Sequence, residues 1–143
     1  MTAPPPSCRR SPHARSNAAS TTTRFTDPST ILYATAPAGH PDHDALTSMH
    51  AELVNFRTSS GAPYRLVPLP FPGEHRDQDG ELLPATYANF LITNRSVLLP
   101  VYGVAADAAA IAVLADALPT RRVIPIDCRA IILQHGSLHC LTM

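Results

Sequence analysis

The sequence predicts one globular domain of the α/β class. With 143 residues, 45% of them hydrophobic, the chain is long enough to bury a single core. Apolar, β-branched segments alternate with segments whose apolar residues recur at helical spacing, an order typical of α/β proteins. This order occurs twice, in 29–70 and in 87–127, so we expect two similar modules.

The first module is expected to contain two strands and a helix. The segment 29–35 (STILYAT) predicts a buried strand because it is β-branched and apolar. The segment 64–70 (YRLVPLP) predicts a second strand, whose prolines place its far end at a sheet edge or in a loop. We expect 71–85 to be a polar loop. Between the strands, a helix is indicated by apolar residues three and four positions apart: Leu46, Met49, Leu53 and Phe56.

The second module is expected to repeat this order with one more strand. Segments 87–94 and 96–103 predict two strands joined by a turn. The alanine-rich segment 105–118 predicts an amphipathic helix, because its larger apolar residues share one face. Segments 121–127 and 137–142 predict the last two strands.

Composition excludes several functional classes. Eleven basic residues balance eleven acidic ones without clustering, so we expect no nucleic-acid-binding surface. No apolar run approaches the roughly 20 residues that span a bilayer, so we expect no membrane insertion. Three cysteines at spacings unlike those of zinc ligands indicate a reducing compartment, the cytoplasm, and no metal site. Residues 1–23, rich in Pro, Ser, Thr, Ala and Arg, predict a disordered leader before a domain at 24–143.

The segment 135–140 (HGSLHC) carries reactive side chains near the end of the chain. On a strand, His139 and Cys140 would point to opposite faces, so we do not expect them to share a metal ion or to form a thiol–imidazole pair. Composition alone indicates that Cys140 is a small buried hydrophobe. Asn89 is interpreted either as one face of an ordinary strand, shared with Tyr87, or as a residue at a turn or lining a pocket, because a buried amide needs hydrogen-bond partners.

Five blocks carry a resemblance to a known family: RFTDPSTILYAT, YRLVPLPFP, LPATYANFLITNRSVLLPVYG, VIPIDCRAIILQHGS and HGSLHCLTM. In this order and at these distances they resemble the C-terminal part of the agmatine deiminase and bacterial peptidylarginine deiminase family. The resemblance covers 24–143. It implies part of an α/β propeller (pentein) fold, about two of its five ββαβ modules, and the activity of a guanidine hydrolase.

The resemblance also implies a set of site residues. Cys140 matches the family's nucleophile, Gly136 lies in the same block, and Asn89 matches an asparagine of the active site. The implied reaction is covalent: a thiolate attacks the guanidinium carbon, ammonia leaves, and water hydrolyses the resulting S-alkylthiouronium. The implied substrate is agmatine, which would give N-carbamoylputrescine, with peptidyl arginine as the alternative. We expect no cofactor.

The chain departs from the family in the residues before Arg24. A histidine and an aspartate of the family, which would transfer protons and bind the cation, fall on Ala18 and Ser20. The family's earlier, carboxylate-bearing modules have no counterpart in this sequence. We therefore expect a C-terminal deiminase fragment that is inactive or depends on a partner. The alternative is a non-catalytic domain.

Overall fold

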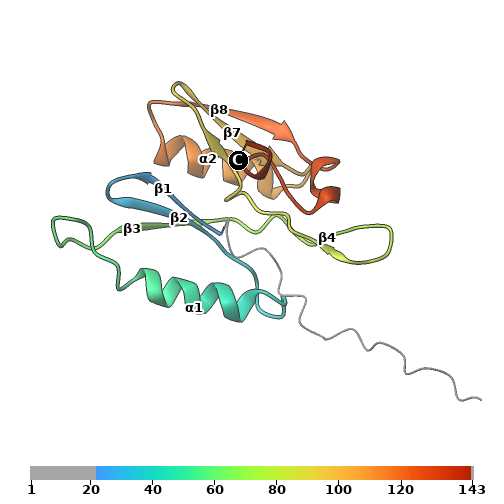
Figure 1. The fold of residues 1–143 in the computed structure, drawn as a ribbon, viewed down its shortest axis with the longest axis horizontal. Helices are drawn as coiled ribbons and strands as arrows, with labels where there is room; N and C mark the ends of the chain where they lie inside the picture. The colour runs from blue at the N-terminus through green and yellow to red at the C-terminus, as the bar shows by residue number, and fades with distance from the viewer. Residues whose placement is uncertain (1–21, 143) are drawn as a thin grey trace, which may run out of the picture.

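The first module is a three-stranded sheet with one crossover helix (Figure 1). The computed structural model describes residues 22–142. Strand β1 (Thr23–Asp27) pairs antiparallel with β2 (Thr30–Ala34). The chain then passes through α1 (His43–Leu53) and returns as β3 (Arg65–Leu69), parallel to β2. The module thus has the order ββαβ, with β2 in the middle.

The second module repeats the first in order and in strand direction. Strand β6 (Leu91–Ile92) pairs antiparallel with β7 (Ser96–Val101). Helix α2 (Ala106–Ala117) leads to β8 (Arg122–Asp127), which is parallel to β7. The expectation of an α/β chain with two similar modules is confirmed.

The prolines of the strands lie at positions where the sheet needs no backbone N–H donor. Pro68 of β3 and Pro125 of β8 occupy edge strands. Pro100 lies in the middle strand β7, but β6 pairs only with Val97 and Leu98 of that strand. Because proline has no backbone N–H, these are positions where it costs little.

The elements stack in alternating layers, with α2 between the two sheets (Figure 1). Helix α2 contacts both β3 and β8, and its many alanines allow close approach on two sides. An ion pair of 2.7 Å between Arg65 and Asp116 also joins the modules, but both side chains are exposed, so its contribution is small. One core spans both modules; among its largest fully buried members are Leu32, Leu69, Tyr87, Phe90, Val97, Leu99, Tyr102 and Leu114.

The segment 71–85, expected to be a loop, contains a short hairpin. Its two antiparallel strands, β4 (His75–Arg76) and β5 (Leu82–Leu83), have two residues each. The turn between them is organised by Asp77, whose Oδ1 accepts the backbone N–H groups of Asp79 and Glu81. Local side-chain bonds of this kind stabilise a turn that hydrophobic periodicity does not reveal.

The strand expected at 137–142 does not form. The chain makes the 3₁₀ helix η2 (Ile131–Gln134) and then η3 (Cys140–Thr142). His135 has a left-handed backbone, with φ of 61°, which turns the chain between them. The N–H of Leu141 bonds to the Ser137 carbonyl at 3.2 Å, so the backbone pairs locally.

Two boundaries also differ from expectation. Helix α1 ends at Leu53, so Phe56, expected within it, lies beyond it and is exposed. Strand β1 begins at Thr23, one residue before the expected start of the domain at Arg24. The rest of the expected leader, 1–21, lies outside the described residues. Within 22–142 the structure contains no helix with the length and apolar character needed to cross a membrane.

Candidate active site

Cys140 lies at the start of η3 and is exposed at the surface. The side-chain amide of Asn89 donates from Nδ2 to the Cys140 Sγ at 3.2 Å. Asn89 itself is buried, with 3% of its surface exposed. The structure therefore joins two of the three expected site residues by a hydrogen bond, with the amide beneath an accessible sulfur.

The orientation of the Asn89 amide is set from its other side. The backbone N–H of His139 donates to Asn89 Oδ1 at 2.8 Å. Since that N–H can only donate, the oxygen of the amide must face it and the NH₂ group must face Cys140. A donor directed at sulfur stabilises a thiolate more than a thiol, because hydrogen bonds to ionised acceptors are the stronger ones.

Asn89 lies in a turn, one of the alternatives left open by the sequence. The N–H of Asn89 bonds to the Thr86 carbonyl at 3.4 Å, and the N–H of Ala88 bonds to Thr86 Oγ1 at 3.2 Å. The interpretation of Tyr87 and Asn89 as one face of a strand is therefore wrong. One residue, Phe90, separates this turn from β6.

Gly136, the third expected residue, lies against Cys140. A Cβ atom added to Gly136 would be 3.4 Å from the Cys140 Cβ and 4.0 Å from its Sγ. The absence of a side chain at this position leaves room beside the thiol. Asn89, Gly136 and Cys140 thus form one cluster, called the thiol cluster below.

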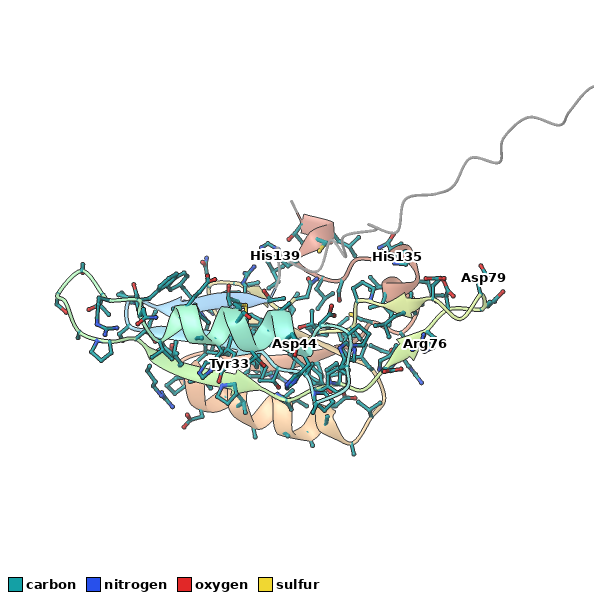
Figure 2. The ribbon with its side chains drawn as sticks, turned by 90° about the horizontal axis from the view of Figure 1, so that it is seen from below. Tyr33, Asp44, Arg76, Asp79, His135 and His139 are labelled. Atoms are coloured by element: carbon teal, nitrogen blue, oxygen red, sulfur yellow. The ribbon has the colours of Figure 1, made fainter. Side chains whose placement is uncertain are left out.

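His139 is not separated from Cys140 by strand geometry, because the strand on which that expectation depended does not form. Its Nδ1 is buried and has no hydrogen-bond partner among the described residues. Burial, and secondly the charge of Arg24, lower the pKa of His139, which favours its neutral imidazole. Figure 2 shows His135 and His139 on the C-terminal segment, on the opposite side of the fold from α2.

Arg24 is a residue near the site that the sequence did not single out. Its guanidinium carbon lies 5.3 Å from the centroid of the Phe90 ring, in a cation–π contact. Burial lowers the pKa of Arg24, although the side chain stays charged. Its position at the start of the RFTDPSTILYAT block was the available signal.

The rest of the described chain offers no metal-binding cluster that would compete with the thiol cluster as the candidate site. Residues 22–142 contain no group of three or more His, Cys, Asp or Glu side chains able to hold a metal ion. A half-open recess of about 170 Å³ lies between β2 and α1, lined by Tyr33, Ala34, Thr35, Ala36, Leu46, Thr47 and His50. No member of the thiol cluster lines this recess. Ala18 and Ser20 lie outside the described residues.

Comparison with known sequences identifies relatives over most of the chain. The family model for Porphyromonas-type peptidyl-arginine deiminase matches residues 17–143. A provisionally named agmatine deiminase of Selenomonas ruminantium is 41% identical over 70 residues, which is 49% of this chain and 19% of that protein. One from Streptomyces coelicolor is 29% identical over 120 residues, which is 82% of this chain and 35% of that protein.

Solved structures match in three dimensions. A provisionally named arginine deiminase of Porphyromonas gingivalis superposes with a TM-score of 0.81 at 47% identity, covering 85% of this chain and 36% of its own. The agmatine deiminase of C. jejuni gives 0.74 at 32% identity, covering 84% and 36%. The agmatine deiminase of Enterococcus faecalis, at 19% identity and a TM-score of 0.76, matches in fold and covers 83% and 37%.

The chain spans well under half the length of these relatives. The two ββαβ modules correspond to part of the pentein fold of agmatine and arginine deiminases, so the expected fold is confirmed. The family model covers nearly all of the sequence, including every described residue. The chain therefore belongs to the Porphyromonas-type peptidyl-arginine deiminase family.

Proposed function

We propose that this chain carries the nucleophile of an agmatine deiminase-like guanidine hydrolase, and that the nucleophile is Cys140. The observation that carries the proposal is the 3.2 Å hydrogen bond from Asn89 to the Cys140 sulfur, at an exposed position beside Gly136, which has no side chain. A hydrogen bond that favours the thiolate is what a cysteine nucleophile requires, because the thiolate is the reactive form.

The proposed reaction converts agmatine and water into N-carbamoylputrescine and ammonia. The Cys140 thiolate attacks the guanidinium carbon, and the C–N bond to the departing nitrogen breaks as that nitrogen takes a proton. Water then attacks the S-alkylthiouronium, the C–S bond breaks, and the thiolate returns. Neither step needs a metal or a cofactor. A C. jejuni relative has been solved as a cysteine-to-serine variant with substrate bound, which supports chemistry at a cysteine in this family.

Peptidyl arginine is the second candidate substrate. The family description names peptidyl-arginine, and one of the similar solved structures bears that name as well. Both substrates present the same guanidinium to the thiol cluster, so the described contacts favour neither by themselves. The agmatine assignment rests on the names of the sequence relatives. A non-catalytic domain is the third candidate.

We propose further that the 143-residue chain is inactive by itself. The resemblance puts the proton-transferring histidine and the cation-binding aspartate at positions occupied here by Ala18 and Ser20. Neither side chain can transfer a proton at neutral pH or bind a guanidinium as a carboxylate does. These groups would have to be supplied from outside the 143 residues. The cytoplasm is the compartment we propose, because it keeps an exposed thiol reduced.

Ammonia release from agmatine tests the proposal. The chain alone should release none. The chain mixed with the part of the P. gingivalis relative outside the matched region should release ammonia, and the Cys140→Ser variant in the same mixture should not. Peptidyl arginine as the better substrate in that mixture would favour the second candidate. No turnover in the mixture, together with no labelling of Cys140 by a haloacetamidine, would contradict the enzymatic function. The non-catalytic domain would then be the remaining candidate.

A further inference from the structure

We propose that Tyr87 is a positioning residue for the nucleophile: its hydrogen bond to Asp107 holds the turn that carries Asn89, and so sets the contact between Asn89 and Cys140. This inference rests on the proposed function only in taking Cys140 as the nucleophile. Neither Tyr87 nor Asp107 belongs to the thiol cluster.

The acceptor of the Tyr87 hydroxyl is itself held rigidly. Tyr87 donates to Asp107 Oδ1 at 2.6 Å. The other oxygen of that carboxylate, Oδ2, accepts the backbone N–H groups of Gly103 at 2.8 Å and Val104 at 3.0 Å. The N–H of Tyr102 also donates to the carboxylate, at 3.1 Å to Oδ1. Asp107 is therefore fixed to the chain between β7 and α2, and Tyr87 is tied to that fixed point.

A second tyrosine holds the residue before Tyr87. The Tyr102 hydroxyl donates to the Thr86 carbonyl at 3.0 Å and accepts the Thr86 N–H, also at 3.0 Å. The two tyrosine rings lie 5.7 Å apart, and both side chains are almost completely buried. Because Thr86 and Tyr87 are each anchored to the β7–α2 segment, the start of the turn cannot shift without breaking buried hydrogen bonds.

The turn connects these anchored residues to Asn89 and so fixes the position of Asn89. Thr86 accepts the backbone N–H groups of Ala88 and Asn89. Asn89 is two residues from Tyr87, and residues 87–90 are all buried. The Asn89 amide must reach both Cys140 and the His139 N–H. Hydrogen bonds weaken steeply with distance and misalignment, so a small shift of the turn would weaken both.

The Tyr87 hydroxyl stays protonated, and so remains a donor, well above neutral pH. Burial, the hydrogen bond to Asp107 and the charge of Asp107 all raise the pKa of Tyr87 far above its ordinary value. Near neutral pH, where the Asp107 carboxylate is charged, the anchor is thus not a titrating switch. Its expected effect is a constant geometric one.

Alkylation of Cys140 by iodoacetamide in the full chain, followed by peptide mass analysis, tests the inference. Tyr87→Phe keeps the buried ring and removes only the donor, and should slow Cys140 alkylation about fivefold. In an Asn89→Ala background, where the amide is gone, Tyr87→Phe should change the rate no further. Tyr64→Phe is the matched control: the Tyr64 ring packs against Phe25, away from the turn, and the rate should not change.

Cys128 distinguishes a positional effect from unfolding. This cysteine is completely buried, so its alkylation reports opening of the fold. In Tyr87→Phe it should stay unmodified. If that variant unfolds, Tyr102→Phe, which releases Thr86 instead, provides the same comparison with the same expected slowing.

Unchanged Cys140 alkylation in folded Tyr87→Phe would overturn the inference. So would an equal slowing with and without Asn89, because the effect would then not pass through the amide. Both readouts are independent of agmatine turnover. Failure of the proposed function, seen as absent ammonia release, is therefore separate from failure of the positioning role.

Discussion

Asn89 donates a hydrogen bond to the sulfur of Cys140 at 3.2 Å, although the two residues are 51 positions apart in the sequence. The same amide accepts the His139 N–H, so one buried side chain fixes both the backbone before the thiol and the environment of the thiol. The first, buried turn of the second module thereby supports an exposed cysteine at the end of the chain. The reactivity of Cys140 should depend on this one amide.

Replacing Asn89 with aspartate changes only the atom that faces sulfur. In Asn89→Asp, one oxygen can still accept the His139 N–H, while the other presents negative charge to Cys140. Since like charges disfavour a thiolate, alkylation of Cys140 by iodoacetamide at pH 7 should slow about tenfold or more. Asn94→Asp, at an exposed turn position, is the control and should leave the rate as it is. Equal rates in wild type and Asn89→Asp would contradict the proposed contact.

A methyl group added at Gly136 should restrict the thiol without unfolding the chain. Gly136→Ala places a methyl group at ordinary contact distance, 3.4 Å, from the Cys140 Cβ. The free energy of unfolding should change by less than about 1 kcal/mol. Alkylation by a bulky maleimide should slow more than alkylation by iodoacetamide.

Gly61→Ala is the opposite case and serves as the matched control. Gly61 has open space around it but a φ of +82°, where an added Cβ is strained. We expect a loss of about 1 kcal/mol in stability and no change in the ratio of the two alkylation rates. If Gly136→Ala left that ratio unchanged as well, Gly136 would not border the approach to sulfur.

Removal of the Asp107 charge should destabilise the fold in a pH-dependent way. Asp107→Asn loses the carboxylate that accepts from Tyr87, Gly103 and Val104, which should cost about 2 kcal/mol at pH 7 in denaturant unfolding. Burial raises the pKa of Asp107, but these hydrogen bonds outweigh it and leave the pKa below its ordinary value.

A carboxyl whose pKa is lowered by folding stabilises the protein above its unfolded pKa and loses that contribution as the pH falls through the folded pKa. The difference between wild type and Asp107→Asn should therefore close below about pH 4. Asp116→Asn, which removes only an exposed ion pair, should cost less than about 1 kcal/mol. If the difference in unfolding free energy between wild type and Asp107→Asn stayed constant down to pH 3, the charge of Asp107 would not be the source of its stabilisation.

His139 should make the protein less stable as the pH falls below 7. Burial, and then Arg24, lower its pKa in the folded state, so the unfolded chain takes up a proton first. Stability is therefore lost as the pH falls from about 6.5 toward the folded pKa. His139→Gln should reduce the slope of unfolding free energy against pH between 5 and 7. His135→Asn is the control: its side chain is exposed, and Asn tolerates the left-handed φ. An identical slope in His139→Gln and wild type would contradict the burial of the imidazole.

The elements predicted best are those whose own residues determine them. β-branched strands such as β2 and the alanine-rich α2 follow from local propensity and periodicity. The prediction of a C-terminal strand was wrong because other features determine the conformation of that segment. These are the left-handed backbone of His135 and the hydrogen bonds of the distant Asn89 amide to residues 139 and 140. No window of sequence around 137–142 contains that information.

The candidate site could be predicted in part. Resemblance of whole blocks indicated Asn89, Gly136 and Cys140, and the structure brings all three together. The supporting contact between Tyr87 and Asp107 was missed, because it joins a turn to a helix 20 residues later. The available signal was the buried tyrosine itself, whose hydroxyl needs a partner.

Trapping the covalent intermediate tests whether Cys140 is the nucleophile. The chain, mixed with the complementary part of the P. gingivalis relative and with agmatine, is quenched in acid, and its peptides are analysed by mass spectrometry. We expect an adduct on Cys140 with the composition of agmatine less ammonia, absent in Cys140→Ser. Ammonia release without an adduct on Cys140, or an adduct on another residue, would contradict it.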